Sequence, residues 1–379
     1  MKICHIHYSR FPFLTTPIPY EITKNLHEIG IESHVIALSL GPGENLEEVF
    51  AGVKVTRIPI SHNQRNVLSL EKFTQIAKSI LLEDAYDIVH VYAFRGASYL
   101  RLRAMKTNNK WLYHLITGNI TGGIKSFINN RLIKVESRKF DTIVVNTKNV
   151  GKRILGDVPT IEIPPGVDYN RFIPGINHKL RSELGYEPND IIAVYSGSFS
   201  PYRKLDALIM GFSLTLGDCN QLKLLIVGSG EKKPLESLVS KLNIESHVKI
   251  LGPFPYTSMQ RFISIADIGL AYVPITPEYN PQPALKTLEM LSSGKPVIAT
   301  ATDGNAYFIR DGENGLLVND LPLNIAEGLL RVVNDENLRN KISHGARLSV
   351  KEFDWRQIVK DRLVPVYRQM IGENTEIHS

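Results

Sequence analysis

The stretch IIAVYSGSFSPYRKLDALIMGF, residues 191–212, decides the fold. It begins with an apolar run, Ile191 to Val194, that predicts a buried strand. A loop of small residues follows, and then Leu205, Leu208 and Ile209 recur at the spacing of one helix face. A strand–loop–helix unit of this kind, repeated along a chain, is typical of a parallel, doubly wound α/β sheet.

The same alternation continues on both sides of this unit. The pattern predicts strands at residues 2–8, 33–38, 53–60, 88–92, 111–116, 142–146, 160–164, 191–196, 222–228, 248–252, 268–273, 296–300 and 315–318. It predicts helices at residues 19–29, 69–83, 96–106, 124–138, 147–155, 204–216, 231–242, 257–265, 284–293, 321–334 and from there to about 352. The fold class is therefore expected to be α/β throughout.

A proline-rich segment, residues 164–190, interrupts the alternation and is interpreted as a linker. We therefore expect a first domain at residues 1–165 and a second at 166–353. A last helix, about residues 354–379, is expected to cross back to the first domain, with a kink at Pro365. Two Rossmann-like, doubly wound domains would face an interdomain cleft, where ligands of such sheets bind.

The composition is that of a soluble globular protein. The chain has 379 residues, of which 43% are hydrophobic and 22% charged, enough for two domains. Cys4 and Cys219 cannot form a disulfide framework, which favours a reducing, cytoplasmic setting. No run approaches the ~20 apolar residues of a membrane-spanning helix. The net charge of +6 is spread along the chain, so ordinary solubility explains it better than peripheral docking on an anionic inner membrane face, which stays an alternative.

The loop after the strand at 191–196 has the features of a phosphate site. Gly197 and Ser198 let the backbone approach an anion, and a helix N-terminus follows. Arg203 and Lys204 add cations at that end, where the helix dipole disfavours them unless an anion is bound. The alternative is a solvated basic turn, and we favour the phosphate site.

Two further loops follow strands of the second half. Gly228 and Gly230 form a Gly-x-Gly turn without the third glycine of a dinucleotide-binding fingerprint. Pro253 and Phe254 belong to a proline-stiffened segment whose exposed backbone groups can read a nucleobase edge. A tight turn and a rigid loop are the structural alternatives for these segments.

The segment NPQPALKTLEMLSSGKPV, residues 280–297, gives the most specific signal. It predicts a short helix in which Glu289 lies on the face that should turn inward. A carboxylate there needs partners, and two vicinal sugar hydroxyls are suitable ones. The alternative is an exposed ion pair between Lys286 and Glu289.

These four segments, in this order, resemble the retaining, nucleotide-sugar-dependent glycosyltransferases of the GT-B fold, in family 4. Residues 165–168 (PGVD) look like the hinge element of that family, and residues 311–318 (DGENGLLV) are similar to its D-G-x-N-G-L-L-V run. The resemblance is clear from about Ile163 to the end of the chain and weaker before it.

The resemblance implies roles for individual residues. Lys204 would neutralise the donor diphosphate and Glu289 would bind the ribose hydroxyls, the two residues on which catalysis would depend. Donor contacts would come from these residues and backbone segments: Gly197, Ser198, Arg203, Gly228, Gly230, Pro253, Phe254, Gln282, Ala284, Leu285 and Lys286. The resemblance implies a UDP- or GDP-sugar as substrate, no cofactor and no metal.

The sequence departs from the family at several positions. Ser198 stands where the family usually has arginine, and Pro281 stands where it often has a first glutamate. The paired glycines usual near the N-terminus are replaced by Thr15-Thr16-Pro17.

On the acceptor side, Thr117 aligns with a histidine of many family members, and Thr117, Gly118 and Asn119 are candidate acceptor residues. His90 and His114 are better interpreted as packed strand histidines.

The favoured function is transfer of a sugar from a nucleotide sugar to a glycan or lipid-linked acceptor. One alternative is a nucleotide-sugar 2-epimerase, although no convincing cluster of acid–base residues is present. Another is a catalytically impaired GT-B-shaped binding partner, suggested by Ser198 and Pro281. Nucleic-acid binding is disfavoured because no basic–aromatic stripe is present.

Overall fold

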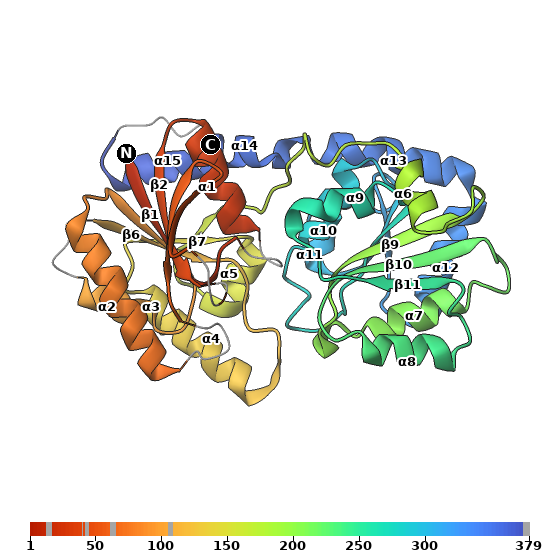
Figure 1. Ribbon diagram of the computed structural model, residues 1–379, viewed down its shortest axis with the longest axis horizontal. Helices are drawn as coiled ribbons and strands as arrows, with labels where there is room; N and C mark the ends of the chain where they lie inside the picture. The colour runs from red at the N-terminus through yellow and green to blue at the C-terminus, as the bar shows by residue number, and fades with distance from the viewer. Residues whose placement is uncertain (13–16, 40, 42–44, 61–65, 105–108, 374–379) are drawn as a thin grey trace. The chain divides into compact units, whose positions relative to one another are not determined.

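The computed structural model describes residues 1–12, 17–39, 41, 45–60, 66–104 and 109–373. Thr15 and Thr16 therefore lie outside the described residues. The chain forms two compact units, Met1–Pro165 with Trp355–Ser379, and Gly166–Asp354 (Figure 1). The first unit is thus built from both ends of the sequence.

The first unit is a twisted sheet with the strand order β3-β4-β2-β1-β5-β6-β7-β8. Its strands are β1 (Lys2–Arg10), β2 (Glu32–Leu38), β3 (Glu47–Phe50), β4 (Val53–Ile58), β5 (Ile88–Tyr92), β6 (Lys110–Leu115), β7 (Thr142–Val145) and β8 (Ile161–Glu162). All neighbouring strands pair in parallel except β3 and β4. Parallel strands need crossover helices, and these cover both faces of the sheet.

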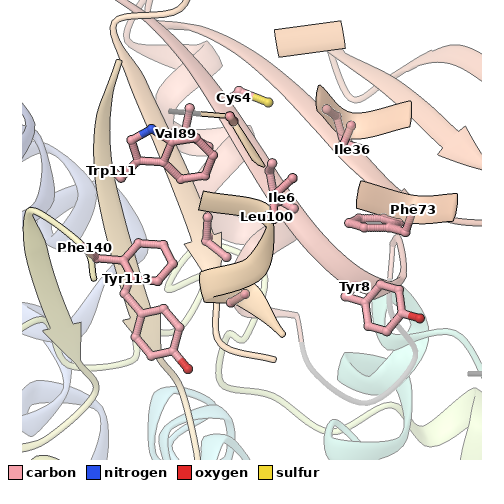
Figure 2. Close-up of a cluster of buried hydrophobic side chains, with 14 of the residues drawn as sticks. Cys4, Ile6, Tyr8, Ile36, Phe73, Val89, Leu100, Trp111, Tyr113 and Phe140 are labelled. Atoms are coloured by element: carbon pink, nitrogen blue, oxygen red, sulfur yellow. The ribbon is translucent and has the colours of Figure 1, made fainter. Parts of the chain in front are cut away.

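Alternate residues of the strands form the core beneath these helices. The helices are α1 (Ile18–Glu28), α2 (Val67–Glu83), α3 (Ala97–Arg103), α4 (Gly123–Ser137) and α5 (Lys148–Leu155). Cys4, Ile6 and Tyr8 of β1 pack with Phe73 of α2 and Leu100 of α3 (Figure 2). The intervening residues of β1 point to the opposite face, as the two-residue period of a strand requires.

The C-terminal segment supplies part of that opposite face. It consists of α14 (Trp355–Gln357), a π-helical stretch η5 (Ile358–Leu363) and α15 (Val364–Met370). Pro365 has no N–H, and the wide π-helical turn ends two residues before it; the kink expected at this proline stays a prediction. Tyr367 of α15 donates a hydrogen bond to Nδ1 of His90 at 2.6 Å, which ties this segment to β5.

The second unit is a six-stranded sheet in the order β11-β10-β9-β12-β13-β14. Its strands are β9 (Ile191–Ser198), β10 (Leu222–Ser229), β11 (Val248–Leu251), β12 (Ile268–Ala271), β13 (Val297–Thr300) and β14 (Leu316–Val318). All pairs are parallel. The strand order reverses between β9 and β12, and ligands of doubly wound sheets bind outside the strand ends at such a point.

The helices of the second unit follow the strands in turn. They are α6 (His178–Glu183), η2 (Pro201–Arg203), α7 (Leu205–Ser213), α8 (Lys233–Lys241), η3 (Tyr256–Ser258), α9 (Met259–Ile263), α10 (Leu285–Ser292), α11 (Asp303–Ala306), α12 (Pro322–Asn334), α13 (Glu336–Ser349) and η4 (Lys351–Phe353). The two-sheet α/β fold class predicted from the sequence is confirmed.

The structure differs from the sequence prediction in a few short elements. The strand β3 and the helices α6 and α11 were not expected. The segment interpreted as linker is packed: Arg181 of α6 donates to the Ile265 carbonyl at 2.9 Å and pairs with Asp267 at 2.7 Å. Across the described ranges, no helix is both long enough and apolar enough to cross a membrane.

Candidate functional site

The carboxyl ends of β9 and β10 meet at glycines that leave no room for side chains. A Cβ on Gly228 would lie 1.6 Å from the Gly197 carbonyl oxygen. A Cβ on Gly197, whose φ is +151°, would lie 2.9 Å from Nζ of Lys286. Only glycine therefore fits at these two half-buried positions, where the strand ends pack closely beside the point at which the strand order reverses.

Arg203 and Lys204 follow the end of β9 along the chain. We expected the helix to begin at 204, but it begins at Leu205, because Pro201–Arg203 form a 3₁₀ turn and Lys204 has a left-handed backbone with φ +47°. The Lys204 side chain is exposed, and its carbonyl accepts a hydrogen bond from the Tyr272 hydroxyl at 3.0 Å. No side chain caps α7, so its first N–H groups remain available to an anion.

Lys286 is a buried cation beside the same glycine loop. It is 8% exposed, its Nζ lies 3.6 Å from the centre of the Tyr195 ring, and it donates to the Tyr272 carbonyl at 3.2 Å. Burial holds the pKa of Lys286 well below its usual value, and the charge of Arg203 acts in the same direction. An ammonium group held in this way is stabilised when an anion arrives.

Glu289 lies one turn after Lys286 on α10 and is 6% exposed. The exposed Lys286–Glu289 pair considered from the sequence is therefore excluded, because both side chains are buried. The charge of Glu289 favours protonation of Lys286 and partly offsets the effect of burial. The helix begins at Leu285 after Ala284, which provides no side-chain cap.

The segment before α10 is fixed by its neighbours. Gly304 donates to the Asn280 carbonyl at 2.8 Å, and a Cβ on Gly304 would lie 1.9 Å from the Gln282 carbonyl oxygen. Thr287 donates to Oδ1 of Asn305 at 2.7 Å, and Asn305 donates to the Ala271 carbonyl at the end of β12 at 3.1 Å. These contacts hold residues 280–285 against the strand ends.

The two loops proposed for the nucleoside have different exposure. Gly230 has a φ of +134°, and a Cβ there would lie 2.9 Å from Cβ of Phe199. Pro253 is exposed, whereas the half-buried Phe254 packs its ring on Phe262 with centroids 4.6 Å apart. Phe254 therefore contributes to the core of the unit as well as to the loop.

Tyrosines line the site, and sequence reasoning missed them. Tyr195 lies under Lys286, Tyr272 contacts the backbone of Lys204, and Tyr279 lies 4.5 Å from the guanidinium of Arg203. Burial raises the pKa of Tyr195 to about 12, so its hydroxyl stays protonated. Tyr272 directly follows β12, a position that could have indicated it, whereas Tyr195 lies inside β9.

The acceptor candidates belong to the first unit, after β6. Thr117 donates to the Gly118 carbonyl at 2.8 Å, and a Cβ on Gly118 would lie 2.3 Å from Cδ1 of Ile154. Oδ1 of Asn119 accepts from the Thr121 amide at 2.9 Å and from the Ser126 hydroxyl at 2.9 Å, so this side chain shapes the turn before α4.

His90 and His114 are fully packed strand residues of the first unit. Nε2 of His90 lies 3.0 Å from Nδ1 of His114, whose Nε2 lies 3.1 Å from Oδ1 of Asn146. Asn146 in turn donates to the Ile116 carbonyl at 3.0 Å. This relay requires neutral imidazoles, and burial lowers the pKa of His114 to about 4. Among the described residues, no group of three His, Cys, Asp or Glu could hold a metal ion.

The fold and the site define the class of the protein, two Rossmann-like units of the GT-B glycosyltransferase type. The model of the glycosyl transferases group 1 matches residues 177–349, and the model of glycosyltransferase family 4 matches residues 19–171. The chain belongs to this family 4-like group of glycosyltransferases.

Curated relatives include a D-inositol 3-phosphate glycosyltransferase of Geodermatophilus obscurus, 29% identical over 60% of this chain and 52% of the relative. Another with this name, from Nocardia farcinica, is 31% identical over 47% of this chain and 41% of the relative. The chain spans about half the length of the curated relatives it matches.

Solved structures share the fold over the whole chain. A sucrose-phosphate synthase of Thermosynechococcus elongatus has a TM-score of 0.82 at 20% identity, with 98% of this chain and 100% of that chain covered. The Anabaena protein HepE, solved with UDP-glucose, has a TM-score of 0.79 at 20% identity, with 97% and 99% covered.

Proposed function

We propose that the protein transfers a sugar from a UDP- or GDP-sugar to a glycan or lipid-linked acceptor, with retention of the anomeric configuration. One observation carries this proposal: Arg203 and Lys204 stand directly before α7, and Lys286 of α10 lies beside Gly197, where β9 ends. Three cations in this neighbourhood, one of them partly offset by Glu289, fit a ligand that carries two phosphates.

In this proposal, the diphosphate lies against the start of α7, where the residue before the helix provides no side-chain cap. Lys204 meets it from the exposed side and Lys286 from the buried side, so each phosphate has a cation. As the glycosidic bond breaks, the leaving diphosphate gains negative charge. Fixed cations and N–H groups aimed at that charge lower the barrier, because they need no reorganisation during the reaction.

Lys286 also gives a reason why Ser198 is tolerated. Ser198 provides no cation, but Nζ of Lys286 lies beside the preceding residue, Gly197. The positive charge that position 198 lacks is therefore supplied by Lys286 of α10. This placement argues against the impaired binding partner as the function.

Glu289 is proposed to accept hydrogen bonds from the ribose hydroxyls. The backbone at Gly228 and Gly230 is proposed to adjoin the ribose, Pro253 and Phe254 to frame the base, and the backbone of residues 282–286 to hold the donor sugar. Thr117, Gly118 and Asn119 are proposed to lie on the acceptor side, in a protein placed in the cytoplasm.

The named relatives support this proposal in their chemistry. The curated relatives are called glycosyltransferases of an inositol phosphate, and HepE was solved with UDP-glucose. The names of the curated relatives describe a sugar transfer, and the HepE structure is a complex with a nucleotide sugar. A nucleotide sugar carries the two phosphates that the three cations are proposed to bind.

A donor screen tests the proposed function. Thermal shift with UDP-, GDP- and ADP-sugars identifies the donor, because a bound ligand stabilises the folded state. Hydrolysis of that donor is then followed, and NMR of the released or transferred sugar gives its anomeric configuration. Binding without hydrolysis or transfer across the panel would favour the impaired partner, and an inverted product would refute retention.

A further inference from the structure

Helix α4 exposes an apolar stripe on its outer face. Its members recur at spacings of three and four residues, which places them on one side of a helix. They are Ile124, 80% exposed, Phe127, 61%, Ile128, 51%, Leu132, 37%, and Val135, 58%. Scattered exposed apolar residues need no explanation, but a continuous stripe of five marks an interaction surface.

The side of α4 that faces the protein is the more polar one. Ser126 and Ser137 are buried, and Asn130 contacts the Asn119 amide through Oδ1. Ile133 is the residue of α4 that packs on the described core. A helix that only covered a sheet would show the reverse arrangement, so the outer stripe is not required by the fold of this unit.

Cations surround the stripe. Lys125, Arg131, Arg138 and Lys139 are exposed, and the Arg131 guanidinium lies 5.1 Å from the centre of the Phe127 ring. The single acidic residue of α4, Glu136, is engaged with the backbone N–H groups of Gly96 and Ser98.

The neighbouring helix α5 extends this charge. It packs beside α4 in the first unit (Figure 1). It carries Lys148, Lys152 and Arg153, all exposed, and its sequence contains no acidic residue.

We propose that the outer face of α4 docks the protein on an anionic lipid bilayer. A helix of 15 residues is about 22 Å long, so it would lie in the plane of the interface. Its apolar stripe enters the boundary between headgroups and acyl chains, while lysine and arginine side chains reach the anionic headgroups. This occupant is favoured over a protein partner because apolar and cationic groups alternate around one short helix. The proposal does not depend on the proposed transfer chemistry.

Vesicle co-sedimentation tests this surface. Vesicles of phosphatidylcholine with phosphatidylglycerol are compared with vesicles of phosphatidylcholine alone, at low and at high salt. We expect binding to the anionic vesicles that weakens with salt, since the charge contribution is screened. The double variant Phe127→Ser/Ile128→Ser should bind at least about tenfold more weakly. Lys125→Glu/Arg131→Glu should lose the preference for anionic lipid.

The matched control is Leu321→Ser/Leu323→Ser, which removes two leucines of similar exposure, 59% and 62%, from the second unit. It should bind vesicles as the unchanged protein does. Equal binding by the α4 variants and the control would overturn the proposal. So would a dimer in sedimentation velocity that Phe127→Ser/Ile128→Ser dissociates without any change in vesicle binding, since a second copy would then be the occupant. Unchanged thermal unfolding verifies that each variant is folded.

Discussion

At the scale of single residues, three cations differ mainly in how far each has been removed from water. Lys204 is exposed, Arg203 is half-buried over the ring of Tyr279, and Lys286 is buried over the ring of Tyr195. The sequence indicates all three, because two stand at a helix start and one stands near a buried glutamate. It does not indicate their burial, which depends on tyrosines from separate segments of the chain, Tyr195 in β9 and Tyr279 in a turn.

Lys204→Ala should reduce sugar transfer by about two orders of magnitude or more, the usual effect of removing a group that stabilises leaving-group charge. The fold should be unchanged, because the side chain is exposed. Steady-state kinetics with the identified donor measures the effect, and Lys241→Ala, at an exposed lysine of α8, is the control. Full activity in Lys204→Ala would remove this residue from the proposed mechanism.

Glu289→Gln should weaken donor binding about tenfold or more, because the amide accepts less strongly from two hydroxyls than a carboxylate does. The effect should appear in the donor Kd measured by calorimetry. The matched control is Glu327→Gln, at an exposed glutamate of α12, which should leave the donor Kd unchanged. A donor Kd unaltered in Glu289→Gln would exclude ribose recognition by this residue.

Lys286 should make donor binding dependent on pH. Its pKa is lowered in the free protein, and a bound diphosphate favours the charged form, so binding takes up a proton wherever free Lys286 is neutral. Donor affinity should therefore fall as pH rises through the lowered pKa. Calorimetry in two buffers of different ionisation enthalpy measures the uptake, which Lys286→Met should abolish. An uptake that persists in this variant would assign the proton to another group.

At the scale of elements, the sequence predicts the strands and most helices because their apolar periods are long. It misses β3, whose four residues pair with β4 through a tight turn at Ala51 and Gly52, both at positive φ. It misses α6 because prolines around it suggest an irregular linker, although Asn177 caps the helix through the Leu180 amide. Short elements of this kind depend on tertiary contacts, which local patterns do not contain.

Gly228→Ala should destabilise the second unit by more than about 2 kcal/mol, because the new Cβ would meet the Gly197 carbonyl oxygen and separate β9 from β10. Donor binding should be lost with it. Gly217→Ala is the control, since nothing lies within 4 Å of a Cβ at that exposed glycine. Equal unfolding midpoints in denaturant for the two variants would contradict the prediction, because they would show that β9 and β10 can move apart at this point without loss of stability.

At the scale of the whole molecule, a chain of hydrogen-bonded neutral histidines connects the last helix of the first unit to the sheet of that unit. His90 and His114 connect Tyr367 of the last helix to Asn146. Burial lowers the pKa of both histidines. The relay was not predicted from the sequence, which indicated packed histidines but not their alignment across three strands and a distant helix.

The stability of the first unit should fall as pH drops below about 6.5, the ordinary pKa of histidine. Below this pH the histidines of the unfolded chain are protonated, whereas His114 of the folded unit stays neutral down to about pH 4. Each such histidine therefore lowers the free energy of unfolding by up to about 1.4 kcal/mol per pH unit. Both tryptophans, Trp111 and Trp355, belong to this unit, so their fluorescence reports its unfolding in denaturant. The slope between pH 7 and 5.5 should decrease in His114→Gln and stay unchanged in His178→Gln, an exposed control. An absence of slope would contradict neutral packing.

The division of the first unit between the two ends of the chain bears on how the protein is synthesised. On a ribosome, β1 to β8 emerge early, but the segment from Trp355, whose Tyr367 contacts His90, emerges only after the whole second unit. The second unit, continuous from Gly166 to Asp354, can complete its sheet while part of one face of the first unit is still uncovered. Nascent chains stalled before Trp355 should therefore depend on chaperones that shield this part of the face until the segment has been translated.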